Sequence, residues 1–302
     1  MELKALANEL FNLDTLKYEY VVLDVETTSF SKNEFRIIEI ALIVINSTGE
    51  RVSAWHTLVN PECKVTFTKV HGLTDDDVKN APKFSNIASY VAKELKNRIL
   101  VGHNISYDYG VLKSEFARIG IKMPSLPRIC TLQMCYDLEL PLENVTLTTV
   151  RNELKIPEGL AHSALHDTAA TTAVFASLLK LYELRHVNSL RAFSGPNPLI
   201  KNETDWMPQQ LFETDFFIVE RSGINVDSVS EFPIIAKTEI LENLKRDQEL
   251  ARLSQKSQTI CPSCGKGIVV IKNKYAGGQF KGCSKYPECR YSENLAANDR
   301  IE

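Results

Sequence analysis

The chain has 302 residues and a formal net charge of −3 at pH 7, with 44% hydrophobic and 24% charged residues. These proportions are ordinary for a soluble globular protein, and the length is typical of two domains. A net negative charge does not attract nucleic acid, so any binding to a polyanion must come from local basic patches. No apolar run approaches the roughly 20 residues of a membrane span, and no signal peptide opens the chain. We therefore expect an intracellular protein with no membrane partner.

The first part of the chain predicts an α/β domain with a mixed sheet, over residues 18–184. Stretches rich in β-branched and apolar residues predict strands at residues 20–26, 36–46, 52–59 and 98–102. Apolar residues at helical spacing predict helices at residues 87–96, 104–119, 146–154 and 164–184. Thr74 precedes three aspartates, as is typical of a helix N-cap, and Asn104 can cap the helix that follows it.

The pattern weakens after Leu184, where a turn-rich break follows at residues 194–198. Residues 185–257 predict an acidic, partly helical connecting region, with its helix near residues 234–254. The sequence assigns this region no role beyond packing and spacing.

Two carboxylates at the end of the first strand are the first chemical signal. Side chains alternate between the faces of a strand, so Asp24 and Glu26 point the same way. Adjacent carboxylates repel each other unless protons or cations intervene. The pair therefore indicates a metal site, although a solvated strand end is the simpler interpretation of these two residues alone.

Three residues further along the chain can join this pair. Asp108 follows the fourth expected strand, Asp167 lies early in the last helix of the domain, and His162 precedes that helix. Each has an ordinary explanation, as a surface acid, a helix N-terminal acid and a loop histidine. Their joint occurrence favours a site for two divalent metal ions, and hard oxygen ligands suit Mg²⁺ or Mn²⁺.

At this point the sequence resembles the DEDDh 3′–5′ exonucleases, the superfamily of the proofreading subunit of bacterial replicative polymerase. The motifs are Asp24-Val25-Glu26-Thr27-Thr28, His71-Gly72-Leu73-Thr74, His103-Asn104-Ile105-Ser106-Tyr107-Asp108 and His162-x-Ala164-x-x-Asp167. The resemblance covers residues 18–184 and implies a ribonuclease-H-like fold. The sister subclass has a tyrosine where this chain has Ser163, so the resemblance is to the histidine type. His166 competes for the role of the base but fills a variable position.

The resemblance implies a role for each residue of the site. Asp24, Glu26 and Asp167 would hold one metal ion, and Asp24 with Asp108 would hold the second. His162 would take a proton from the attacking water, a task that suits an imidazole near neutral pH. The residues that would face the terminal nucleotide are Thr27, His71 and Asn104. His71 could instead order its loop, and Asn104 could serve only as an N-cap.

Four of the seven cysteines predict a second, smaller domain at residues 258–293. Cys261 and Cys264 form a CxxC pair, and Cys283 and Cys289 complete a tetrahedral set for one structural Zn²⁺. The segment resembles the C-terminal zinc ribbons of bacterial type IA topoisomerases, which implies that it engages single-stranded DNA. The remaining cysteines, Cys63, Cys130 and Cys135, are interpreted as thiols without a special role.

The composition of this ribbon supports binding to a nucleic acid strand. Between Cys261 and Tyr291 there are six basic residues and one acid, interleaved with aromatic residues. Lys281 and Tyr286 are the residues that we expect to contact the strand, because cations and aromatic rings suit sequence-tolerant binding. The aromatic residues could instead fill the small core of the ribbon.

The sequence therefore predicts a metal-dependent 3′–5′ exonuclease that releases nucleoside monophosphates, with single-stranded DNA as substrate and the ribbon as a tether. We expect a bacterial protein of DNA repair or maintenance, cytoplasmic and associated with the nucleoid. A proofreading partner of a polymerase or a member of a repair complex is one alternative. RNA 3′-end trimming and a non-catalytic adaptor that binds single-stranded DNA are two others. The complete set of acidic residues with His162 argues against the adaptor.

Overall fold

The structure, a computed structural model, divides into two compact units, residues 1–245 and 246–302. It describes residues 18–29, 35–157, 159–160, 162–184, 192–196, 217–224, 226–229, 236–256, 261–266, 269–273, 279–283, 285 and 288–294. Over these ranges no helix combines the length and apolar character that crossing a membrane requires.

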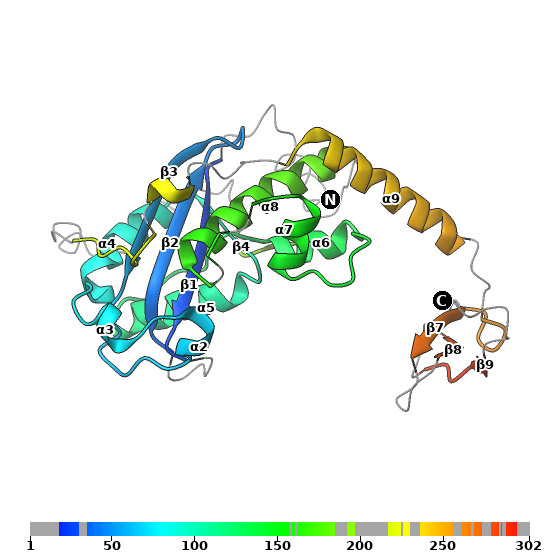
Figure 1. Cartoon of the computed structure of the whole chain (residues 1–302), viewed down its shortest axis with the longest axis horizontal. Helices are drawn as coiled ribbons and strands as arrows, with labels where there is room; N and C mark the ends of the chain where they lie inside the picture. Colours follow the sequence, from blue (N-terminus) through cyan, green and yellow to red (C-terminus); the bar gives the residue numbers. More distant parts are fainter. Residues whose placement is uncertain are drawn as a thin grey trace. The chain divides into compact units, whose positions relative to one another are not determined.

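A six-stranded mixed sheet is the centre of the first unit, in the order β3-β2-β1-β4-β5-β6 (Figure 1). Its strands are β1 (Tyr20–Thr27), β2 (Ile37–Ile45), β3 (Arg51–Leu58), β4 (Ile99–Gly102), β5 (Arg128–Cys130) and β6 (Phe193–Ser194). The β1–β2 and β2–β3 pairs are antiparallel, whereas β1–β4 and β4–β5 are parallel. All nine residues of β2 are buried, as expected for a strand covered on both faces. The predicted mixed sheet is confirmed.

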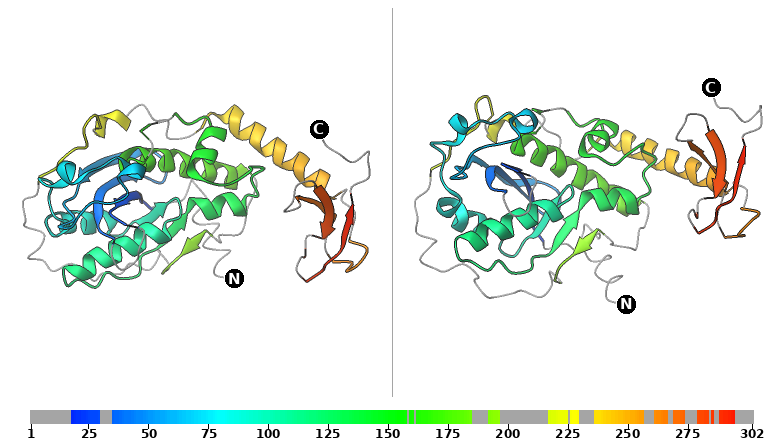
Figure 2. Two further views of the ribbon diagram at one scale, coloured as in Figure 1. Left: turned by 60° about the horizontal axis from the view of Figure 1, so that its bottom comes forward. Right: turned by 90° about the horizontal axis from the view of Figure 1, so that it is seen from below.

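Helices cover both faces of this sheet. The described helices are α2 (Thr68–His71), α3 (Asp75–Val78), α4 (Phe84–Leu95), α5 (Ser106–Arg118), α6 (Thr131–Asp137), α7 (Leu147–Glu153), α8 (Ala164–Leu184), the 3₁₀ helix η2 (Val226–Val229) and α9 (Thr238–Lys256). In Figure 2 the blue strands lie between the green α8 and the turquoise α5. The α8 side also carries α6 and α7, and the other side carries α4 and α5.

Alternation along β1 produces two separate apolar cores. Tyr20 and Val22 pack on the α8 side, where the ring of Tyr20 meets Phe175 edge-on with centroids 5.0 Å apart. Val21 and Leu23 pack on the α4 and α5 side. The same period of two places Asp24 and Glu26 on the α8 side, at the end of the strand. The buried cores on both faces therefore hold these two carboxylates in place.

The structure differs from the sequence-based expectations in a few elements. The sequence did not predict the short elements β5, α6 and β6. Thr74 lies at the N-cap of α3 as predicted, and its backbone N–H donates to Asp77 Oδ2 at 2.7 Å. Asn104 does not cap α5, because the N-cap residue is Ile105. Asn104 is exposed with a φ of 66°, and its contribution to the turn is a carbonyl that accepts from Tyr107 N–H.

Part of the connecting region packs on the first unit. Residues 217–221 run beside the edge strand β3, where the N–H of Leu58 donates to the carbonyl of Val219 at 2.7 Å. Ile224, Val229 and Leu241 are buried in the core on the α8 side. These residues are therefore structural members of the first unit and do more than space two domains.

The second unit contains a small antiparallel sheet in the order β7-β8-β9. Its strands are β7 (Val269–Asn273), β8 (Gln279–Cys283) and β9 (Ser292–Asn294). The buried apolar cluster among its described residues consists of Cys261, Cys283 and Cys289, with Cys264, Val269 and Tyr291 packed against them. The core of this unit is thus built around thiols, as in a fold that a metal ion holds together.

Candidate active site

Asp24 and Glu26 lie at the end of β1, partly buried, on the face that α8 covers. Glu26 is directly opposite Glu39 of β2 in the strand register. Cross-strand neighbours on one face lie close together, so this pairing adds a third carboxylate beside the two that the sequence predicted.

Asp108 lies in the first turn of α5 and is 4% exposed. Its Oδ1 accepts a hydrogen bond from the backbone N–H of Val25 at 3.3 Å. Because Val25 lies between the two β1 carboxylates, this bond ties the start of α5 to the site. Taken alone in the sequence, Asp108 could be an ordinary surface acid, but the structure excludes that interpretation.

Asp167 and His162 approach the same place from the start of α8. The N–H of Asp167 donates to the carbonyl of Ser163 at 2.9 Å, which orients the first turn of the helix. His162 is exposed and has a φ of 56°, in the left-handed region. One ligand atom from each of Glu26, His162 and Asp167 lies within 4.8 Å of the other two. Residues that are more than 130 positions apart in the chain thus converge.

The electrostatics of the site confirm how closely its acids are packed. Burial raises the pKa of Asp24 well above its usual value, and the charges of Asp108 and Asp167 raise it further. Burial is also the main reason that the pKa of Glu26 rises to about 9 and that of Asp108 to about 7. Burial raises the pKa of Asp167 to about 6, although the charge of His162 opposes this rise. The raised pKa values mean that ionisation of these carboxyl groups is unfavourable without a nearby cation. Mg²⁺ and Mn²⁺ prefer oxygen ligands, so these carboxylates fit either ion.

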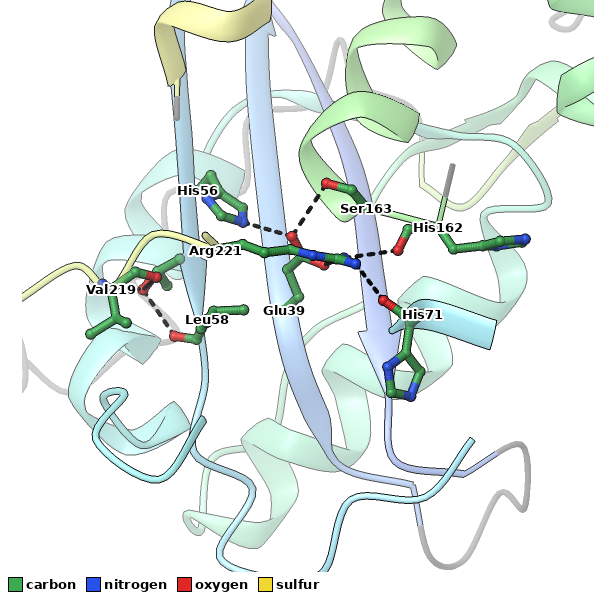
Figure 3. A network of polar contacts seen from close by, with 9 residues as sticks. Glu39, His56, Leu58, His71, His162, Ser163, Val219 and Arg221 are labelled. Carbon is green, nitrogen blue, oxygen red and sulfur yellow. Dashed lines mark hydrogen bonds and ion pairs between the residues drawn. The ribbon is translucent and has the colours of Figure 1, made fainter. Parts of the chain in front are cut away.

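Glu39 and His56 form a fully buried pair beside the site, with Nε2 of His56 2.8 Å from Oε1 of Glu39 (Figure 3). Burial opposes the ionisation of Glu39, but hydrogen bonding and charge from His56, together with the charge of Arg221, lower its pKa. This pair was not predicted from the sequence. The available signal was an acid within an otherwise apolar strand, Ile-Ile-Glu-Ile-Ala.

The residues predicted to face the terminal nucleotide have different surroundings. Thr27 is buried, with its Oγ1 2.6 Å from the hydroxyl of Tyr107, a residue that sequence reasoning did not single out. His71 is 2% exposed, and both ring nitrogens serve its own loop. Its Nδ1 accepts from Leu73 N–H at 3.1 Å, and its Nε2 lies 2.9 Å from the carbonyl of Thr66. This arrangement favours the loop-ordering role for His71, and contact with a nucleotide stays a prediction for all three residues.

The cysteine cluster has the dimensions of a zinc site. The sulfurs of Cys261, Cys264, Cys283 and Cys289 lie within 4.8 Å of one another. Two of the separations, Cys261 to Cys289 and Cys264 to Cys283, are 3.7 Å. A tetrahedron with Zn–S bonds of about 2.3 Å has edges of about 3.8 Å, so the four thiolates fit Zn²⁺. Tyr286 lies outside the described residues, and of Lys281 the structure describes only its place in β8.

Comparison with known families gives two matches. The model of a family described as exonuclease matches residues 21–175, about half of the chain. The model of a family described as topoisomerase DNA-binding C4 zinc finger matches residues 258–298. The first match contains the whole set of predicted acidic residues and His162, and the second contains all four clustered cysteines.

Curated proteins with similar sequences include bacterial polymerases and a bacterial exonuclease. A PolC-type DNA polymerase III from Oceanobacillus iheyensis is 36% identical over 154 residues, which cover 50% of this chain and 11% of the polymerase. The 3′-5′ exonuclease DinG of Bacillus subtilis is 29% identical over 167 residues, covering 54% of this chain and 18% of that protein. The chain thus spans less than a fifth of either relative.

Solved structures with a similar fold include exonuclease I of E. coli in complex with a dT13 oligonucleotide. It is 17% identical, with a TM-score of 0.48, over 56% of this chain and 42% of that chain. A full-length 3′-exonuclease is 19% identical, with a TM-score of 0.47, over 60% of this chain and 68% of that chain.

The raised carboxylate pKa values predict that the metal-free protein loses stability as pH rises. A carboxyl group whose folded pKa exceeds its unfolded pKa adds stability below the unfolded value, and this stability is lost as pH rises through the folded value. For Asp108 that pKa is about 7, so ionisation costs on the order of 4 kcal/mol before relaxation. We expect Asp108→Asn to melt at a higher temperature than the unsubstituted protein at pH 9 in chelator, and this difference to become much smaller at pH 5, because most of the loss occurs between pH 5 and pH 7.

Thermal unfolding followed by circular dichroism checks this expectation. Asp76→Asn is the matched control, because the side chain of Asp76 is 87% exposed, and its melting curve should follow that of the unsubstituted protein. Added Mg²⁺ should recover stability at pH 9 in the unsubstituted protein more than in Asp108→Asn. Parallel pH profiles for Asp108→Asn and the unsubstituted protein would show that Asp108 carries no such strain.

Proposed function

The chain belongs to the exonuclease family, and from this membership and its acidic site we propose that it is a metal-dependent 3′–5′ exonuclease of single-stranded DNA. The observation that carries the proposal is the convergence of Glu26, His162 and Asp167, with ligand atoms within 4.8 Å of one another. Asp24 and Asp108 border the same place: the charge of Asp108 raises the pKa of Asp24, and Oδ1 of Asp108 accepts from the N–H of Val25 at 3.3 Å. Four carboxylates and one histidine at a single point match the chemistry of phosphodiester hydrolysis.

The proposed metal ligands are the four carboxylates of Asp24, Glu26, Asp108 and Asp167. Two divalent ions, Mg²⁺ or Mn²⁺, supply positive charge that stabilises the negative charge developing on the phosphate and its attacking and leaving oxygens. The residues orient these charges, and the buried surroundings make the electrostatic interactions stronger than they are in water.

His162 is the proposed general base. Its side chain is exposed, so an attacking water can reach it from solvent. An imidazole nitrogen takes the proton of that water as the water oxygen bonds to phosphorus. The bond between phosphorus and the 3′ oxygen of the preceding nucleotide breaks, and this leaving oxygen takes a proton from solvent. The neighbouring carboxylate of Asp167 then stabilises the imidazolium, in the same way that the charge of His162 opposes the rise in the pKa of Asp167. The product is a nucleoside monophosphate.

DNA is the proposed substrate because of what the matched proteins are. The relatives include PolC-type DNA polymerases III and the 3′-5′ exonuclease DinG, and the second matched family is described as DNA-binding. The same likeness supports a role in DNA replication or repair, with a polymerase or a repair complex as partner.

We propose three functional segments. Residues 18–184 form the exonuclease domain, residues 185–257 connect it to the ribbon, and residues 258–293 form the ribbon with one structural Zn²⁺. Lys266, Lys285 and Arg290 are exposed on the ribbon, which supports its action as a substrate tether.

Digestion of a 5′-labelled single-stranded DNA oligonucleotide with Mg²⁺ tests the activity, with a matched RNA in parallel. We expect a ladder that shortens from the 3′ end on DNA, and no ladder in chelator. Asp24→Ala should abolish cleavage and retain binding, because it removes a proposed metal ligand. His162→Gln should lower kcat by about 10²- to 10⁴-fold, the usual contribution of a general base.

The exposed acid variant Asp76→Ala controls for a general effect of lost charge and should cleave normally. Preference for RNA would move the protein to the RNA-trimming class. Tight binding without cleavage of either strand would favour the adaptor. Retained cleavage by Asp24→Ala would overturn the metal assignment.

The ribbon gives a separate prediction. Cys283→Ser removes a buried member of the thiolate set, so the protein should lose its bound zinc, as measured by elemental analysis. Affinity for a long single strand at moderate salt should fall, as measured by fluorescence anisotropy, because the tether unfolds. Cys63→Ser, at an exposed thiol outside the cluster, is the control and should change neither quantity. If zinc is lost but the affinity for the single strand is unchanged, the ribbon has a structural or protein-binding role and does not tether the substrate.

A further inference from the structure

Arg221 belongs to the connecting region, outside residues 21–175, yet its guanidinium group reaches the proposed catalytic centre (Figure 3). Nη1 donates to Oε2 of Glu39 at 2.9 Å and to the backbone carbonyl of His162 at 2.9 Å. Nη2 donates to the backbone carbonyl of His71. One side chain thus joins a central strand to the loops of two residues that the sequence assigned to the site.

The strand partner of Arg221 is a rigid anchor. Glu39 is fully buried in β2, opposite Glu26. Its Oε1 accepts from Nε2 of His56 at 2.8 Å and from the hydroxyl of Ser163 at 3.4 Å. A buried carboxylate with several donors cannot move without leaving charge unpaired, so it fixes the guanidinium in space.

The backbone around Arg221 is anchored as well. Two residues earlier, Val219 N–H donates to Oγ1 of Thr57 at 3.0 Å, and the carbonyl of Val219 accepts from Leu58 N–H at 2.7 Å. This places residues 219–221 along the end of β3. The Arg221 side chain is only 10% exposed, so it points into the protein and away from solvent.

The receiving loop is shaped for close approach of the guanidinium. Gly72 follows His71 with a φ of 75°, and a Cβ at this position would lie 3.3 Å from Nη2 of Arg221. A side chain here would crowd the guanidinium and strain the backbone. The His71 carbonyl is therefore accessible because the next residue is glycine.

The second loop carries the proposed base in a disfavoured conformation. His162 has a φ of 56°, and its side chain is exposed, so little packing holds it. Residues in sparsely populated backbone conformations persist only where surrounding contacts determine them. The hydrogen bond from Arg221 to the His162 carbonyl is such a contact.

We propose that Arg221 is a positioning residue of the exonuclease site, which locks the loops of His162 and His71 against Glu39. The connecting region therefore completes the active site. This inference rests on the proposed function, because it assigns His162 the role of the base. In this role Arg221 acts through the backbone carbonyl of His162 and not on the substrate itself.

A purely structural role, neutralising the buried Glu39, makes a different prediction. Lysine at position 221 also neutralises that charge, but an ammonium group lacks the planar fork that reaches two or three acceptors in fixed directions. A neutralising role is therefore retained in Arg221→Lys, and a positioning role is lost.

Single-turnover digestion of a 5′-labelled oligonucleotide with excess enzyme measures the difference. We expect Arg221→Ala and Arg221→Lys to lower the cleavage rate by about 10- to 100-fold, the cost of a misplaced catalytic group. The Kd for the oligonucleotide should change far less, and millimolar guanidinium should partly restore Arg221→Ala but not His162→Gln. Ser222→Ala, at the exposed next residue, is the matched control and should cleave like the unsubstituted protein.

Hydrogen–deuterium exchange of the full chain gives a readout that needs no activity. Arg221→Ala should increase exchange at residues 68–73 and 162–166, with α4 unchanged. An unaltered cleavage rate in Arg221→Lys, or unchanged exchange at both loops in Arg221→Ala, would overturn the inference. If the unsubstituted protein cleaves neither DNA nor RNA, the exonuclease function fails, and the exchange result then decides whether Arg221 restrains the two loops.

Discussion

Negative charge gathered at the end of β1 is the constraint on which the rest of the site depends. Five carboxylates meet there, those of Asp24, Glu26, Glu39, Asp108 and Asp167. Burial makes their joint ionisation unfavourable unless opposite charge or protons offset the repulsion. Two features of the site offset this repulsion. Arg221 neutralises Glu39 from within the fold and His56 hydrogen-bonds to it, whereas the other four acids are the proposed ligands of divalent cations.

The site divides its work between a rigid sheet and two loops. β1 and the first turns of α5 and α8 carry the acids, and these elements are held by apolar cores on both faces of the sheet. The loop before α8 carries the histidine, whose exposed ring has room to exchange protons with solvent. Rigid placement suits residues that hold charge, and a position at the surface suits a residue that moves protons.

Local sequence patterns predicted the acidic residues of the site. The other contacts of the site depend on packing between residues that are far apart in the chain. Asp24 and Glu26 share a strand face because of a period of two, and Asp167 lies in the first turn of an apolar helix, so both features are readable in short windows of sequence. Arg221 and Glu39 are separated by 182 positions, and no local pattern indicates their contact. Asn104 was wrongly predicted as an N-cap, because its backbone is left-handed and the helix begins two residues later. Short elements such as β5 lack a periodic signal and depend on their neighbours.

The hydrogen bonds between Val219 and the end of β3 also bear on how this chain can be divided. β3 is an edge strand, and an open edge offers unpaired N–H and C=O groups to any other extended chain. A fragment that ends where the family match ends, at residue 175, keeps β3 but lacks Val219. Such a fragment exposes the hydroxyl of Thr57 and the backbone N–H of Leu58, and leaves the carboxylate of Glu39 without its arginine. We therefore expect chains truncated before Val219 to self-associate through the exposed edge of β3.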